Sequence, residues 1–308
     1  MRISLGFSSH ELGGVRLSSR YAEICWTDPR PYQRSSKPYN AFTVNFLWDL
    51  SLLGYVTTEQ AGVFYGASLN TIRRHLTFWH NKGLIQGAWV PYRHQRTRIW
   101  TLAPGGVELL QEEDDTAWDL LHPRWVSFPD QHRTLHSVEH NLDRTTAALA
   151  IAKNAENYRL DANWDKTYTR VVAATQYVSV YLKPDAAIWI NGNPWFIELE
   201  RSWRNRTLLH KLTQYDHIAM HGLWRKVPQC HEPPKVLLIP TEANTQSINF
   251  KNWMTTFSLY QHGYVWVWPW DHVLKKDFTI YGGDGDTTLV SRNFWKLNQA
   301  PAYPGRVR

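Results

Sequence analysis

The sequence is poor in cysteine and has no long apolar run. Only Cys25 and Cys230 are cysteines among 308 residues, which excludes a disulfide framework and a four-cysteine zinc site. No apolar run reaches the roughly 18 residues that a membrane-spanning helix requires. The first residues, MRISLGFSSHELGG, lack the apolar core of a signal peptide. We therefore expect a cytoplasmic protein without a membrane partner.

The composition is that of an ordinary globular protein, but its charge is uneven. Hydrophobic residues make up 43% and charged residues 20%, and the length favours two domains. The net charge is +7, and residues 1–110 hold 12 Lys and Arg against 6 Asp and Glu. A basic first third beside a nearly neutral remainder suggests contact with a polyanion.

The basic third carries a pattern of three helices. Apolar spacing predicts a helix over Ala41–Leu53, and Thr57 and Thr58 cap a short helix that follows. Residues 66–68 form a tight turn. A third helix then begins at Leu69, buries a face of Leu69, Ile72, Leu76 and Trp79, and ends at Gly83.

Strand-like residues follow the third helix, at 84–85, 88–90 and 98–102, with a hairpin tip over residues 91–97. Helix, helix, turn, helix and a two-stranded hairpin are typical of a winged helix-turn-helix over residues 39–110. The last helix of that fold enters the major groove of DNA. Residues 1–38 would be an arm or irregular lead.

The predicted winged helix offers two sets of polar side chains to double-stranded DNA. The DNA-binding residues expected from the helix and the hairpin are Asn70, Thr71, Arg73, Arg74, Arg93, Arg96 and Arg98. The alternative is that this domain docks a protein. Whether Arg73 and Arg74 read bases or contact phosphates stays open at this point.

A linker over residues 111–131 precedes a second domain over residues 132–300. The second domain opens with a long helical pattern on which His132, His136 and His140 share a face. Histidines at this spacing can bind a metal, but a polar helix face or an interdomain contact is the favoured interpretation. Strands and helices alternate after it, which predicts a mixed sheet flanked by helices.

Three acidic residues stand out in this second domain. Asp185 precedes a predicted hairpin, and Glu198 and Glu200 lie 13 and 15 residues later. Period-2 alternation places both glutamates on one strand face, and the hairpin brings Asp185 beside Glu198. Clustered carboxylates repel unless a cation joins them, and oxygen ligands of this kind suit Mg²⁺ or Mn²⁺. The alternative is an ion-pair network with Arg201 or Arg204.

The spacing of these acids resembles the PD-(D/E)XK nuclease-like fold. That resemblance implies that Asp185 and Glu198 hold the metal ion, with Glu139 on the first helix completing the set. The family's usual lysine would stand two residues after Glu198, where this chain has Glu200. Lys211 on the next helix would supply the missing ammonium, so the implied catalytic set is Asp185, Glu198, Glu200 and Lys211.

The order of motifs over roughly residues 40–270 resembles the replication-relaxation family. These motifs are a winged helix, HSVEHNLDR, KPDA, FIELERS and LLHKLTQY. The resemblance implies a plasmid, phage or integrative-element protein that acts in replication, DNA relaxation or transfer. Relaxase or replication proteins would be its partners, and a palindromic DNA site would favour a homodimer.

Two function classes follow from this sequence. One is a metal-dependent DNA endonuclease or nickase guided by its winged helix. The other is a non-catalytic transcription regulator, replication initiator or relaxosome accessory factor on an inactive nuclease scaffold. A resemblance to transposon-end endonuclease subunits fits less well, because in those proteins the nuclease domain usually comes first and the lysine is usually present.

Overall fold

The chain was analysed as a computed structural model. It describes residues 26–27, 30–32, 34, 38–114, 135–155, 162–165, 171–174, 179–182, 184–190, 193–200, 205–226, 233–241, 263–283 and 289–298. Most of the predicted arm and most of the predicted linker lie outside these residues.

Three helices begin the described chain, and each has a side chain that caps its first turn. They are α1 (Ala41–Leu53), α2 (Thr58–Tyr65) and α3 (Leu69–Asn81). Asn40 and Ser68 accept hydrogen bonds from the first turns of α1 and α3, and Thr57 forms a capping box with Gln60. The three helices expected from the sequence are therefore present.

A small antiparallel sheet accompanies these helices. Its strands are β1 (Val56–Thr57), β2 (Ile85–Tyr92) and β3 (Gln95–Leu102), in the order β1-β3-β2. The expectation of a long tip over residues 91–97 was wrong, because only Arg93 and His94 form the turn. Both have positive φ, 51° and 65°, which gives a two-residue turn that matches the twist of the paired strands.

The core of this N-terminal part lies between the helices, the sheet and α4 (Pro104–Glu113). Ile72, Leu76 and Trp79 of α3 are fully buried, as expected. Leu69 was wrongly placed on that face and is 41% exposed. It is the first residue of α3 and lies at the end of the face on which Ile72, Leu76 and Trp79 are buried.

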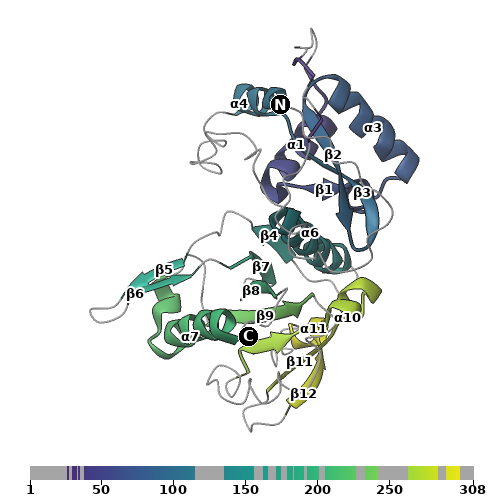
Figure 1. Cartoon of the computed structure of the whole chain (residues 1–308). Helices are drawn as coiled ribbons and strands as arrows, with labels where there is room; N and C mark the ends of the chain where they lie inside the picture. The colour runs from purple at the N-terminus through teal and green to yellow at the C-terminus, as the bar shows by residue number, and fades with distance from the viewer. Residues whose placement is uncertain are drawn as a thin grey trace, which may run out of the picture.

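Helix α6 (Leu135–Ala155) lies between the N-terminal part and a larger sheet (Figure 1). Its Val138 and Leu142 pack against Val90 and Ile99 of the small sheet. Further along the helix, alanines and Ile151 pack on the large sheet. One helix therefore shares its apolar surface between two cores.

The large sheet has seven strands, in the order β12-β11-β10-β9-β8-β7-β4. Its strands are β4 (Ala162–Asp165), β7 (Ala186–Ile190), β8 (Asn193–Glu200), β9 (Lys235–Pro240), β10 (Val265–Val267), β11 (Thr279–Gly283) and β12 (Leu289–Asn293). Strands β8, β9 and β10 are parallel to one another, and the other pairs are antiparallel. The expected mixed sheet with helices is therefore confirmed, and the protein is of the α+β type.

Outside this sheet, β5 (Val171–Ala174) pairs with β6 (Ser179–Leu182). The remaining short or flanking helices are α7 (Asn205–Met220), η3 (Leu223–Lys226), α10 (Trp270–Lys275) and α11 (Phe294–Leu297). Figure 1 shows the β5–β6 hairpin beside α7, at one end of the molecule.

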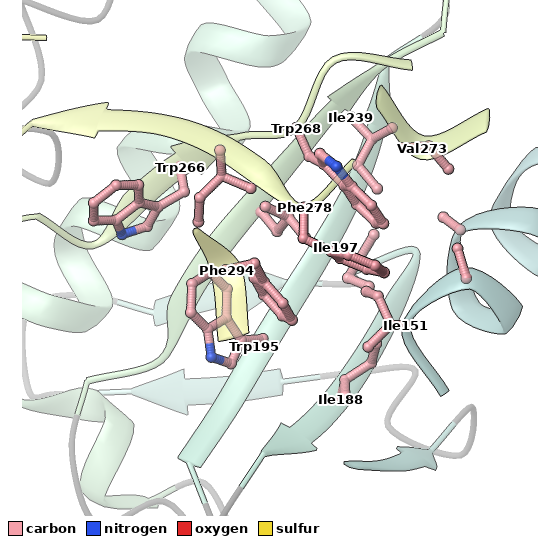
Figure 2. Close-up of a cluster of buried hydrophobic side chains, with 14 of the residues drawn as sticks. Ile151, Ile188, Trp195, Ile197, Ile239, Trp266, Trp268, Val273, Phe278 and Phe294 are labelled. Carbon is pink, nitrogen blue, oxygen red and sulfur yellow. The ribbon is translucent and has the colours of Figure 1, made fainter. Parts of the chain in front are cut away.

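Aromatic side chains fill one face of the large sheet. Figure 2 shows Trp195, Trp268, Phe278 and Phe294 in one cluster of buried side chains. All three tryptophans of the segment VWVWPW are at most 5% exposed, so they are core side chains and not a stacking platform. The expected sheet face holds for Trp266 alone, because β10 ends at Val267 and Trp270 begins α10. The opposite face of β8 carries Glu198 and Glu200.

Candidate functional site

Asp185 is held beside β8 by hydrogen bonds to its backbone and to its carboxylate. Its backbone N–H donates to the carbonyl of Ile197 at 3.0 Å. The N–H of Leu199 donates to its Oδ2 at 2.9 Å, and His140 Nε2 lies 2.9 Å from its Oδ1. The hairpin formed by β7 and β8 therefore brings Asp185 beside Glu198, as the sequence predicts.

Glu198 is buried, with 1% of its surface exposed, and helix α7 neutralises it. Lys211 Nζ donates to Glu198 Oε2 at 2.7 Å, and the Tyr215 hydroxyl donates to Oε1 at 2.7 Å. Lys211 also lies 3.6 Å from Glu200 Oε1. Lys211 and Tyr215 are one helical turn apart, so a single face of α7 supplies both donors. Arg201 and Arg204, the partners considered from the sequence, lie outside the described residues.

The environment shifts the pKa values of the acids in opposite directions. Burial raises the pKa of Glu198, and the negative charge of Asp185 adds to this effect. Burial alone would raise the pKa of Asp185 too, but the His140 hydrogen bond, the Lys211 charge and the Leu199 N–H hold it well below its usual range. Burial likewise favours a neutral Lys211, yet the surrounding carboxylates keep its pKa above the ordinary value.

The predicted catalytic residues Asp185, Glu198, Glu200 and Lys211 thus come together, but the donor set does not fit a divalent cation. Each carboxylate oxygen of Asp185 and Glu198 already has a hydrogen-bonding partner from the protein. Within the described part of the chain, no three His, Cys, Asp or Glu side chains are grouped to hold a metal ion. The ammonium of Lys211 lies 2.7 Å from Glu198 and 3.6 Å from Glu200, so a protein cation already pairs with one of the two acids to which the resemblance assigns the metal ion.

Helix α6 contributes a residue to this site that the sequence analysis did not place beside Asp185. The resemblance implies Glu139, whereas the neighbouring His140 contacts Asp185. Arg144, one turn later, donates to the carbonyl of Asp185 at 3.3 Å and to that of Leu53 at 3.2 Å. The i, i+4 spacing of His140 and Arg144 is the signal in the sequence that could have found this pair.

A second candidate site is the outer surface of α3 and the β2–β3 hairpin. The polar side chains on this face of α3 that are exposed to solvent are Asn70, Thr71, Arg73, Arg74 and Thr77. On the hairpin, Arg96 is exposed and Arg98 is half-buried. The sequence has no Asp or Glu from residue 60 to residue 107, a stretch that holds six Lys and Arg. This surface therefore suits a polyanion.

Arg93, the remaining predicted DNA contact, has partners inside the molecule. Its guanidinium lies 2.8 Å from Asp143 of α6 and 4.1 Å from the ring centroid of Trp270. Asp143 has a side chain only 2% exposed and also accepts a hydrogen bond from Tyr92 at 2.8 Å. Arg93 therefore ties the turn of the hairpin to α6 and α10.

The comparison with family models decides the relationship of this chain to known proteins. The model described as replication-relaxation matches residues 47–229, more than half of the chain. The chain belongs to the replication-relaxation family. The matched range runs from α1 through α7 and contains both candidate sites.

Membership of the replication-relaxation family supports a role in the replication or relaxation of a mobile element. No curated protein and no solved structure matches the chain. Among the described helices, none has the length and apolar character needed to span a membrane.

Proposed function

We propose that this replication-relaxation protein binds duplex DNA through a winged helix made of α1, α2, α3 and the three-stranded sheet. In this arrangement α3 lies in the major groove, and the β2–β3 hairpin is the wing. The observation that carries the proposal is the exposed, acid-free face of α3, with Arg73 and Arg74 at its centre. Its apolar face is buried, so the polar face is free for a ligand.

The positions of the polar residues along α3 suggest which of them contact bases and which contact phosphates. Asn70 and Thr71 lie in the first turn, the part of a recognition helix that meets base edges. Arg73 and Arg74 reach phosphates or guanines, and arginine pairs with either in a bidentate geometry. Arg96 on the wing contacts phosphates beside the major-groove site. Phosphate contacts set affinity, whereas base contacts set sequence preference.

We propose that the large sheet and its helices form a PD-(D/E)XK-like scaffold that does not catalyse a reaction. The support is the site formed by Asp185, Glu198 and Lys211, whose charges and hydrogen bonds the protein satisfies by itself. On this proposal the protein is a regulator, a replication initiator or an accessory factor that brings relaxase or replication proteins to DNA.

Metal-dependent DNA cleavage is the second candidate function. One observation favours it: Asp185, Glu198, Glu200 and Lys211 meet at one end of β8, as the nuclease-like resemblance implies. A Mg²⁺ or Mn²⁺ ion at Glu198 would have to displace the hydrogen bonds from Lys211 and Tyr215. We therefore place this function second.

DNA binding is tested with the full chain and a labelled duplex, by fluorescence anisotropy at several salt concentrations. We expect Arg73→Ala/Arg74→Ala to weaken binding by at least about tenfold and to lower the salt slope by about 2. Lys275→Ala is the matched control, because it removes an exposed cation on α10 and should change affinity less than about twofold. Equal affinities for the double variant and the wild type would contradict the proposal.

A further inference from the structure

Trp89 is an exposed tryptophan on the β2–β3 hairpin. More than half of its surface, 53%, is open to solvent, whereas Trp79, Trp195 and Trp295 are fully buried. Trp89 stands on β2 opposite Arg98 of β3, so the pairing of the strands fixes the position of its backbone. Among the residues that the structure describes, the hydrophobic clusters do not include this side chain.

Cations and aromatic rings alternate on this face of the hairpin. The guanidinium of Arg96 lies 5.2 Å from the ring centroid of Trp89. That of Arg98 lies 5.8 Å from Trp89 and 4.3 Å from Trp100. We call these four residues the tryptophan–arginine ladder. Its inner end meets α3, because His80 in the last turn of that helix packs against the Trp100 ring.

The two tryptophans of the ladder differ in their surroundings. Trp100 is 3% exposed, and its indole N–H donates to the Thr58 hydroxyl at 3.1 Å. Trp100 therefore belongs to the N-terminal core. Trp89 instead presents a large apolar ring to water between two guanidinium groups, and an indole in such a setting can stack on a planar, electron-poor partner.

A nucleotide carries an aromatic base and a phosphate, the two kinds of group that the exposed part of the ladder (Trp89, Arg96 and Arg98) can bind. Its base offers a flat ring to Trp89, and its phosphate offers a negative charge to Arg96 and Arg98. The charge of the surrounding chain favours this occupant, since no acidic residue occurs from residue 60 to residue 107. In duplex DNA the neighbouring base pairs cover both faces of each internal base, so stacking on Trp89 requires an unpaired base.

We propose that Trp89 stacks on an unpaired base of DNA while Arg96 and Arg98 bind phosphates of the same strand. This inference rests on the proposed DNA binding and adds a preference for locally opened or single-stranded DNA beside the duplex held by α3. The β2–β3 hairpin thereby binds a DNA strand that is locally unpaired.

The test compares three probes of one sequence: a duplex, the same duplex with a short central unpaired segment, and a single strand. Anisotropy measures the affinity of the full chain for each probe. We expect Trp89→Ala to weaken binding to the two probes with unpaired bases by about tenfold, and binding to the duplex by less than about twofold. Trp89→Phe keeps an aromatic face and should restore most of the lost affinity.

A second readout reports stacking directly. The probes carry 2-aminopurine in the unpaired segment, and we expect the wild type and Trp89→Phe to quench its fluorescence on binding. Trp89→Ala should bind the opened duplex through α3 without this quenching. Leu274→Ala, which truncates another exposed apolar side chain on α10, should behave as the wild type in both assays.

The outcomes separate this inference from the proposed function. Loss of duplex binding in Arg73→Ala/Arg74→Ala together with unchanged binding of all probes by Trp89→Ala would overturn the inference and keep the proposed function. Equal weakening of all three probes by Trp89→Ala would also overturn it. A wild type that binds single strands through Trp89 but does not bind the duplex would keep the stacking site and overturn the duplex proposal.

Discussion

At the scale of single residues, the burial of an ionised Glu198 carboxylate depends on the positive charge of Lys211. Glu198 is buried, and its other oxygen is bound to a neutral hydroxyl, that of Tyr215. At about pH 9, above the raised pKa of Glu198, we expect Lys211→Met to lower the free energy of unfolding by about 3–5 kcal/mol, because it leaves a buried carboxylate without a counter-ion, and to cost less at about pH 6, where Glu198 is protonated. Urea denaturation measures this change.

The matched variants for this prediction are Lys275→Met and a double variant. Lys275→Met removes an exposed pair with Asp271 and should cost less than about 1 kcal/mol. Adding Glu198→Gln to Lys211→Met should restore part of the lost stability. A cost below about 1 kcal/mol for Lys211→Met at about pH 9 would contradict the role given to this lysine.

The opposite pKa shifts of Glu198 and Asp185 predict opposite pH dependences. Burial raises the pKa of Glu198, so its contribution to stability is largest below the unfolded pKa of about 4.3 and falls as pH rises through the folded pKa. The wild type should therefore lose stability relative to Glu198→Gln as pH rises from about 5 to 9.

Asp185 behaves in the other direction. Although burial opposes ionisation, His140 and Lys211 hold the pKa of Asp185 low, so its contribution is present above about pH 4 and is lost as pH falls through the folded pKa. The wild type should lose its advantage over Asp185→Asn on acidification. Melting temperatures across pH measure both trends, and slopes of the same sign for the two variants would contradict the assignment.

In this site, the acidic residues on the hairpin could be predicted from the sequence, but their partners on the helices could not. Alternation along one strand was enough to place Glu198 and Glu200 on a common face, and the hairpin placed Asp185 beside them. The helical partners of these acids lie 11 or more residues away in the sequence, on helices whose rotation about their axes depends on packing. For this reason Lys211 was anticipated only through a resemblance, and His140 was mistaken for part of a polar face.

At the scale of elements, the end of α3 depends on a glycine in close contact with backbone. Gly83 has φ +73°, and a Cβ there would lie 2.4 Å from the carbonyl oxygen of Arg30. Gly66 has φ +60° but open space around it. We expect Gly66→Ala to cost about 1–2 kcal/mol for the left-handed conformation alone, and Gly83→Ala to cost clearly more.

Denaturant unfolding of the two glycine variants checks this prediction. Because both positions share a positive φ, the difference between their costs isolates the contact with residues 30 and 31. Equal costs would show that the segment around residue 30 does not pack against Gly83 as described.

The elements themselves were largely predictable, for identifiable reasons. The cap at Thr57, the turn over residues 66–68 and the apolar spacing in α3 gave boundaries within a residue or two. The hairpin was harder, since Arg93 and His94 are not the usual Asn-Gly pair of a two-residue turn. The sequence signal was too weak to show that the strands extend to Tyr92 and Gln95.

At the scale of the whole molecule, α6 and Arg93 join the small sheet to the large one. Leu142 packs on the small sheet and also accepts a hydrogen bond from Gln60 through its carbonyl, while Arg144 connects Leu53 to Asp185. The sequence divided the chain into domains at the linker, and composition alone gives no sign that one helix serves two cores.

The position of Arg93 predicts that stability and DNA affinity respond differently to its removal. We expect Arg93→Ala to lower the free energy of unfolding by about 3 kcal/mol, because it removes the cation paired with the buried Asp143 and leaves that carboxylate with the neutral Tyr92 hydroxyl as a donor. Its DNA affinity should fall less than that of Arg96→Ala, whose side chain is exposed. The reverse ranking, with unchanged stability, would assign Arg93 to the DNA interface.

The central claim is that the protein binds DNA with α3 and its wing while the site at Asp185 and Glu198 serves the fold. The most direct measurement places the wild type, Arg73→Ala/Arg74→Ala and the isosteric Asp185→Asn/Glu198→Gln on supercoiled plasmid with Mg²⁺, Mn²⁺ or EDTA, beside a mobility-shift assay. We predict a shift by the wild type and the acid-pair variant, a loss of the shift in the arginine variant, and no strand cutting in any metal. Metal-dependent cutting by the wild type that the acid-pair variant lacks would contradict this claim and establish a nuclease.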